Sequence, residues 1–369
     1  MEKIEALHNQ AMDLAEKAII FRIRKRIDES IDVFNEAFLL EKEAAMLLKD
    51  LYEFEPSRSI MFRSAASLAL NARLFRDAEK MIAIGLSGNP SESIADELRN
   101  LYENINFEKH LQLRGVTLTE NDVQLSLAGS AVSYGMIKAD EFIRRAEIIN
   151  NMTIRTAERL LNRPFRENGR VPKEIKEDFE TYYSIPRAPS FALTLRIGYK
   201  QKIYDLFEDN DIQTVVIDEI IENIKMVNNR DEKKLKEKIA NEDYFSNSLA
   251  LIKKLSPDNK AVSLVGLTAI RNGNDNKVAF TRTTEEIKIA PIIHNLDVSN
   301  MEEIIIHGKL EYANANTDDI RLRTEEELYT ICVPKGLLAD IVKPYWEQHV
   351  TIKGKKQDKK IFFEDLQVE

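Results

Sequence analysis

Hydrophobic positions recur at three- and four-residue steps through the first 106 residues of the chain. A period near 3.6 residues places apolar side chains along one face of a helix, so the pattern predicts amphipathic helices. The charged stretch "RKRIDE" separates two such stripes and predicts a bend between antiparallel helices. The stripes consist of Ala11, Leu14, Ala15, Ala18 and Phe21, and then of Ile31, Phe34, Ala37 and Phe38.

A second helical pair follows the first. Phe62, Ala65, Ala66 and Ala69 form its first face, "NARLF" forms its bend, and the second helix ends before Pro90. Ser91 begins "SESIADELRNLYENI", which has the N-cap residue and periodicity of a closing helix. The pattern therefore predicts two helical hairpins and one further helix.

Small residues at the helix crossings and a terminal proline make these hairpins resemble the tetratricopeptide repeat. The matching residues are Ala66, Ala78, Ile82 and Pro90 in the second hairpin, and Leu14, Ala18, Phe21, Phe34 and Ala37 in the first. The hairpins are offset by 48 residues, from Ala18 to Ala66, where the family spacing is about 34. Ser30 and Lys42 stand where the family pattern has alanine and proline.

The resemblance implies a concave surface that binds a protein. Its concave positions correspond to Arg22 in the first hairpin and to Arg63, Ser67 and Asn71 in the second. The last three are spaced by four residues and form one polar ridge, which suits hydrogen bonding to a peptide or carboxylate. The alternative interpretation is a solvent-facing helix side on a plain scaffold.

Residues 107–256 have a mixed pattern. Short strands are predicted around the turn at Glu120–Asp122 and in "SFALTLRIGY", with a helix over "KADEFIRRAEIINNMTIRTAERLLN" between them. A helical run over residues 211–255 completes this segment.

From residue 257 the period changes to alternation. Strands are predicted in "AVSLVGLTAI" and "KVAFTRTTEEIKIAP", around the "NGND" turn. Three strands (303–312, 320–323, 328–333), a short helix (336–343) and two strands (349–353, 361–366) follow, which is the order of an OB-type barrel. Ile304, Ile306, Leu310 and Tyr312 are expected to point into this barrel.

The predicted fold class is therefore α+β and multidomain. Residues 1–106 form the all-α hairpins, residues 107–256 form a mixed α/β segment, and residues 257–369 form a β-rich domain with a barrel over about 301–369. An apolar fraction of 43% and a charged fraction of 31% fit a chain that folds through most of its length.

Composition limits the function classes. The single cysteine, Cys332, excludes an intrachain disulfide framework and a cysteine-based zinc site. The N-terminal run is acidic and no segment reaches eighteen consecutive apolar residues, so we expect a cytoplasmic protein without a membrane partner. The net charge of -9 argues against a surface that binds phosphate throughout, but it permits local basic patches.

Catalytic signatures are sparse. The five histidines lack metal-ligand spacing, and neither a phosphate-binding loop nor a GxSxG motif occurs, so we expect no cofactor and no metal. Asp258, Glu286 and Lys288 follow the degenerate order of a divalent-metal nuclease motif. The alternative, which we favour, is a turn aspartate followed by exposed strand charges.

Two basic clusters predict contact with a polyanion. Arg155, Arg159 and Arg163 share one helix side, although a structural ion-pair role for them is the favoured alternative. The second cluster lies in and beside the loop between the last two predicted strands, where OB-type barrels bind ligands. It consists of Arg321, Arg323, Lys353, Lys355, Lys356, Lys359 and Lys360.

These observations favour a non-enzymatic adaptor or regulatory protein that binds a protein partner through its N-terminal hairpins. The alternative is a nucleic-acid-binding protein, extending to a weak metal-dependent nuclease, that uses the basic patches of the middle and C-terminal segments.

Overall fold

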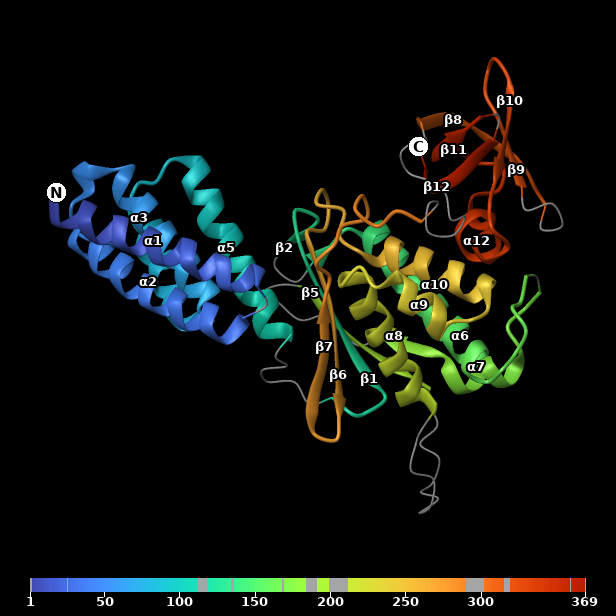
Figure 1. The fold of residues 1–369 in the computed structure, drawn as a ribbon, viewed down its shortest axis with the longest axis horizontal. Coiled ribbons are helices and arrows are strands. Elements are labelled where there is room, and N and C mark those ends of the chain that lie inside the picture. Colours follow the sequence, from blue (N-terminus) through green and yellow to red (C-terminus); the bar gives the residue numbers. More distant parts are fainter. Residues whose placement is uncertain are drawn as a thin grey trace. The chain divides into compact units, whose positions relative to one another are not determined.

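The computed structural model describes residues 2–24, 26–111, 118–133, 136–167, 169–183, 191–198, 212–289, 302–314, 319–358 and 360–368. The chain divides into two compact units, Met1–His110 (unit 1) and Leu111–Glu369 (unit 2), which Figure 1 shows as blue-to-cyan helices and as the remaining ribbon.

Unit 1 is helical, as the periodicity predicts. Its described elements are α1 (Glu2–Ile23), α2 (Ile27–Leu47), the 3-10 turn η1 (Tyr52–Phe54), α3 (Ser57–Asn71), α4 (Phe75–Leu86) and α5 (Glu92–Leu111). Helix α1 packs on α2, α2 on α3, and α3 on α4.

Small residues bring the helices of unit 1 close together. Ala18, Ala37 and Ala66 are fully buried in its core. A Cβ added to Gly85 would lie 3.2 Å from the Phe62 Cβ and 3.0 Å from a Leu98 methyl group. The alanine and glycine positions therefore let the larger core side chains reach across between helices.

Unit 2 contains a five-stranded sheet in the order β4-β5-β1-β6-β7. The strands are β1 (Asp122–Ala128), β4 (Thr181–Tyr183), β5 (Phe191–Ile197), β6 (Leu264–Arg271) and β7 (Asn274–Ala279), with a small separate pair, β2 (Val132–Ser133) and β3 (Met136–Ile137). Leu125 of β1 pairs with Leu193 on one side and Leu267 on the other. The predicted boundary at residues 256/257 therefore lies between strands of a single sheet.

Helices lie on one side of this sheet (Figure 1). They are α6 (Ala139–Leu160), α7 (Lys173–Phe179), α8 (Ile212–Asn228), α9 (Glu232–Lys238) and α10 (Glu242–Leu255). Helix α6 contacts both α8 and α10, and α8 contacts β6 and β7. Alternate residues of the central strands, such as Leu125, Leu195 and Leu267, belong to the same buried core as Ile217 and Leu251 of these helices.

The C-terminal strands form a closed barrel in the order β10-β12-β11-β8-β9. Its elements are β8 (Glu302–Asn314), β9 (Asp319–Arg323), β10 (Leu328–Cys332), the helical segment formed by α12 (Lys335–Leu337), η3 (Leu338–Val342) and η4 (Lys343–Tyr345), and then β11 (His349–Gln357) and β12 (Lys360–Val368). Strand β10 is parallel to β12, and the other pairs are antiparallel. The predicted barrel is confirmed, and its order is compatible with an OB-type barrel.

One barrel position differs from the prediction. Leu310 is fully buried, but Tyr312 is 36% exposed. The β8–β9 register shifts between these two residues, so Tyr312 pairs with the exposed Arg321. This irregularity explains why simple alternation placed the Tyr312 side chain inside.

Candidate functional site

The four residues predicted to bind a partner lie on helices that are joined by polar contacts. Arg22 of α1 donates a hydrogen bond to the Asn71 Oδ1 of α3 at 2.8 Å. The Asn71 amide in turn donates to the Ser67 carbonyl at 2.9 Å. Arg63 forms an ion pair with Glu97 of α5, with 2.7 Å between Nε and Oε2. We call the surface that carries Arg22, Arg63, Ser67 and Asn71 the ridge surface.

Isoleucines accompany these polar residues. Ile19 and Ile23 of α1 are 49% and 76% exposed, and Ile60 of α3 is also exposed. Ile19 lies three residues before Arg22, and Ile60 lies three residues before Arg63, so each shares a helix side with its arginine. These isoleucines are not among the residues predicted to bind a partner. The sequence feature that could have revealed them is an isoleucine on a side of an amphipathic helix that does not face the core.

Arg22 is held by a ring and by an amide. Its guanidinium lies over the Phe34 ring, 4.7 Å from the centroid. Partial burial and then the nearby charge of Arg73 lower the pKa of Arg22 from its ordinary value. Because two positive charges approach one another at this place, an anion bound there gains favourable Coulomb energy from both.

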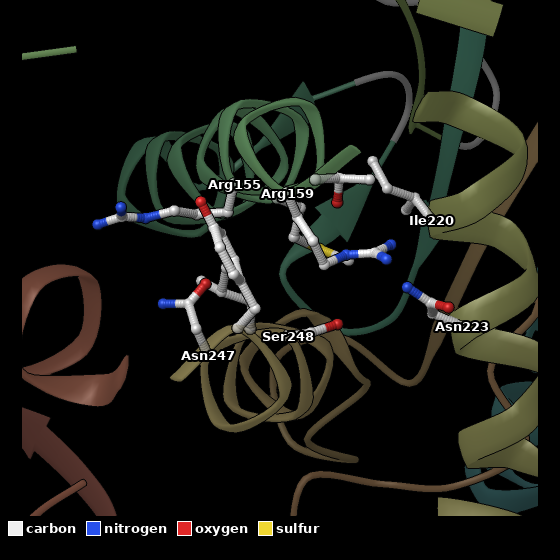
Figure 2. Close-up of a pocket in the computed structure, with 10 residues that line it drawn as sticks. Arg155, Arg159, Ile220, Asn223, Asn247 and Ser248 are labelled. Atoms are coloured by element: carbon white, nitrogen blue, oxygen red, sulfur yellow. The ribbon is translucent and has the colours of Figure 1, made fainter. Parts of the chain in front are cut away.

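A polar pocket in unit 2 lies between α6, α8 and α10 (Figure 2). It is open to solvent on one side. It is lined by Met152, Arg155, Thr156, Arg159, Ile220, Asn223, Tyr244, Asn247, Ser248 and Leu251. The buried Oδ1 atoms of Asn223 and Asn247 accept no hydrogen bond from the described residues. Buried carbonyl oxygens in an open polar pocket are suited to hydrogen bonding with water.

Arg155 in the wall of this pocket is structural. It is 4% exposed, and its Nε and Nη2 donate to the two carboxylate oxygens of Asp340 at 2.6 and 3.1 Å. Its Nη1 donates to Glu158 and to the Arg166 carbonyl. The Phe165 ring lies beneath the guanidinium at 4.4 Å. Arg155 is therefore withdrawn from any phosphate, which excludes the predicted polyanion contact and agrees with the ion-pair role favoured for this stripe.

The Asp340 carboxylate joins α6 to the helical segment of the barrel. Asn247 of α10 donates to Asp340 at 2.9 Å and to the Gly336 carbonyl at 2.7 Å. A Cβ on Gly336 would lie 2.2 Å from the Asp243 carbonyl oxygen, so a side chain there is excluded. Arg155, Asn247 and Asp340 together fix the barrel against the helical layer of unit 2.

The rest of the arginine stripe is also paired. Arg159 binds Glu219 of α8, and Lys238 of α9 reaches the same carboxylate at 2.8 Å. Arg163 lies on the surface, 3.3 Å from Glu174. Figure 2 shows Arg155 and Arg159 leaving α6 in opposite directions, so these two residues do not present a common basic face.

The predicted basic residues of the barrel occupy several environments. Arg321 stacks over the Tyr312 ring at 4.7 Å, and Arg323 pairs with Glu311 at 2.6 Å. Lys355 is buried and paired with Glu303, which withdraws it from the predicted polyanion contact. Lys353 and Lys356 are half-buried and Lys360 is exposed, whereas Lys359 lies outside the described residues.

The nuclease-like residues serve the backbone. The Asp258 carboxylate accepts hydrogen bonds from the amides of Lys260, Ala261 and Val262 at 2.9 to 3.0 Å. Burial opposes the charge of Asp258, but these amides hold its pKa below the ordinary value. Glu286 likewise accepts from the Thr283 amide at 2.7 Å. Asp258 therefore closes a turn, as the alternative interpretation expects, whereas Glu286 lies in a turn beyond the end of β7 and not on the predicted strand.

The described part of the chain has neither a metal-ligand cluster nor a helix that could span a membrane. No group of three or more histidine, cysteine, aspartate or glutamate side chains there is arranged to hold a metal ion. Nor does any helix there have the length and hydropathy needed to cross a membrane.

Comparison of the chain with protein-family models, with curated proteins and with solved structures gives no match. We therefore infer the function from the structures of the two units.

Proposed function

We propose that the protein is an adaptor that binds a protein partner through the ridge surface of unit 1. The observation that carries this proposal is the Arg22–Asn71 hydrogen bond, which brings α1 and α3 together beside exposed isoleucines. Hydrophobic side chains next to fixed hydrogen-bonding groups are typical of protein-binding surfaces. Under this proposal the two hairpins act as tetratricopeptide-like repeats, and α5 closes the stack.

The polar and apolar parts of the ridge surface have different tasks in this proposal. Ile19, Ile23 and Ile60 lose contact with water when a partner covers them, and this burial supplies affinity. Arg22 and Asn71 supply directional hydrogen bonds and so select the partner's register. Because Arg22 is already held by Phe34, it loses little side-chain entropy on binding.

Affinity capture with a matched pair of variants tests the proposal. Tagged full-length protein is incubated with nuclease-treated native lysate, beside Ile23→Glu and Ile143→Glu. Both isoleucines are exposed, at 76% and 51%, so neither change opens a core cavity, and Ile143 lies on α6 of unit 2. We expect a stoichiometric partner with the wild type and with Ile143→Glu, and its loss with Ile23→Glu. Retention by all three proteins contradicts the proposal.

A second candidate function is single-stranded nucleic-acid binding by the barrel. The observation that favours it is the Arg321–Tyr312 stack beside the exposed Leu328, on strands β8, β9 and β10. In OB-type barrels this face binds oligonucleotides, through aromatic stacking and phosphate contacts. If this function holds, affinity for a labelled oligothymidylate falls steeply as salt rises.

A further inference from the structure

Arginines gather where the turns of the two hairpins of unit 1 meet. Arg22 and Arg24 lie at the end of α1, Arg73 lies between α3 and α4, and Arg76 lies near the start of α4. The Arg22–Asn71 hydrogen bond ties the end of α1 to the end of α3, two residues before Arg73. We call these four residues the basic turn cluster.

The cluster has few internal counter-charges. Within the described part of unit 1, Arg26 pairs with Glu29, whereas no carboxylate forms an ion pair with Arg22, Arg24, Arg73 or Arg76. This is notable in a chain with 62 acidic and 53 basic residues. The C-terminal carbonyls of α1 and α3 favour positive charge at Arg22, Arg24 and Arg73. All four arginines are exposed.

Exposed isoleucines border the cluster. Ile23 stands between Arg22 and Arg24, Ile20 lies three residues before Ile23, and Ile27 begins α2. Ile20 and Ile27 are exposed together with Ile23. A ligand that fits this surface must therefore offer carboxylates and apolar side chains at the same time.

We propose that the basic turn cluster binds an acidic segment of the protein partner, with carboxylates on Arg22 and Arg73 and apolar side chains on Ile23 and Ile27. This inference rests on the proposed function and specifies its ligand. A planar guanidinium held by Phe34 and Asn71 is oriented for two-point contact with a carboxylate. Single-stranded nucleic acid fits less well, because isoleucine offers no ring on which a base can stack.

Peptide selection on the full-length protein tests the inference without knowledge of the partner. Random twelve-residue peptides displayed on phage are selected on wild-type protein, and labelled consensus peptides are then titrated by fluorescence anisotropy. The test variant is Arg22→Gln/Arg73→Asn. Glutamine retains a donor toward Asn71, and asparagine tolerates the positive φ of residue 73. The control is Arg99→Gln, which removes an exposed arginine that pairs with Glu92 and Asp96.

We expect peptides that combine Asp or Glu with Ile or Leu. Their affinity should fall about tenfold or more in the double variant and change less than about twofold in Arg99→Gln, since charge-assisted hydrogen bonds contribute roughly 1.5–3 kcal/mol. Peptides without acidic enrichment, or with equal affinity for the double variant, overturn the inference but leave the proposed function standing. Failure of both peptide selection and lysate capture overturns both.

Two further measurements separate other occupants of the same surface. If the wild type binds phosphatidylglycerol vesicles, the double variant does not, and no acidic peptides are selected, then the cluster is a lipid-binding surface. This outcome overturns the inference. Self-association in sedimentation that the double variant abolishes makes a second copy of the chain the occupant, with the same consequence.

Discussion

Arginines at helical spacing have opposite fates in the two units. Arg155 and Arg159 of unit 2 lie against carboxylates supplied by the barrel and by α8. Arg22 of unit 1 meets an amide, a ring and another arginine instead. The local sequences give the same expectation, because each arginine projects from an amphipathic helix. Whether an arginine is ion-paired depends on whether a segment distant in sequence places a carboxylate beside it.

The largest effect is expected when the carboxylate that pairs with Arg155 is removed. Asp340→Ala removes the bidentate partner of a buried guanidinium, and breaking a buried pair costs about 3–5 kcal/mol, here toward the lower end because Glu158 still pairs with Arg155. We expect a loss of this size in the unfolding free energy, measured by urea denaturation followed by circular dichroism. Loss of the Asn247–Asp340 hydrogen bond contributes to the same change.

The double variant Arg155→Met/Asp340→Leu is the matched control. Replacing both charges with apolar side chains leaves no unpaired buried charge, so it should recover much of the stability lost in Asp340→Ala. If Asp340→Ala is as stable as the wild type, Arg155 reaches solvent or another acceptor, and the contrast between the units fails.

A smaller effect is expected at the barrel's second ionic attachment. Burial opposes the charge of Asp365, but Lys254 and Lys253 hold its pKa below the ordinary value. The stability contributed by a depressed carboxyl is fully present above its unfolded pKa, about 3.9, and is lost as the pH falls through the folded value. The wild type should therefore lose stability below about pH 4.

Denaturation midpoints at pH 7 and pH 3 check this expectation against Asp365→Asn. The variant should show a smaller difference between the two pH values, because it lacks the titrating group. An equal pH dependence in both proteins assigns the acid sensitivity to other carboxyls.

The third prediction concerns Arg321, an exposed arginine in unit 2. If the barrel binds single strands, Arg321→Ala should reduce the slope of log affinity against log salt by about one unit. Tyr312→Ala should weaken binding by roughly 1–3 kcal/mol at every salt concentration while leaving the slope unchanged, because its contact is stacking. Fluorescence anisotropy with oligothymidylate between 50 and 200 mM salt distinguishes the two.

Hydrophobic periodicity predicted the helices of unit 1 and the succession of strands and helix along the barrel segment, because these features depend on the local pattern of apolar positions. Hydrophobic periodicity did not predict two features of unit 2. The change of period at residue 257 marks the passage from α10 to β6, but β6 pairs with β1 across more than a hundred residues. The irregularity beyond Leu310 turned Tyr312 outward, and an alternating pattern does not reveal such shifts.

The candidate sites also combine features that the local sequence predicts with features that depend on distant residues. Arg22 and Asn71 were predicted from the resemblance to the tetratricopeptide repeat, and a hydrogen bond joins them. The isoleucines beside them were missed because apolar residues on an amphipathic helix are normally assigned to its core. Arg155 has the ion-pair role that was the favoured interpretation, but its partner Asp340 was not identified because it lies 185 residues away. Local charge patterns therefore predict which helix side is polar, but they do not identify the partners of its charges.

The smallest predicted effect belongs to Arg163, the surface member of the arginine stripe. Its pair with Glu174 spans 3.3 Å, and both side chains are more than half exposed. Such pairs contribute from near zero to about 1 kcal/mol, because water and salt screen the attraction. Arg163→Ala should therefore change the urea midpoint little, and less still at high salt. A loss comparable to that of Asp340→Ala would mean that exposure does not separate structural from available arginines, which would remove the ground for assigning ligand binding to Arg22 and Arg73.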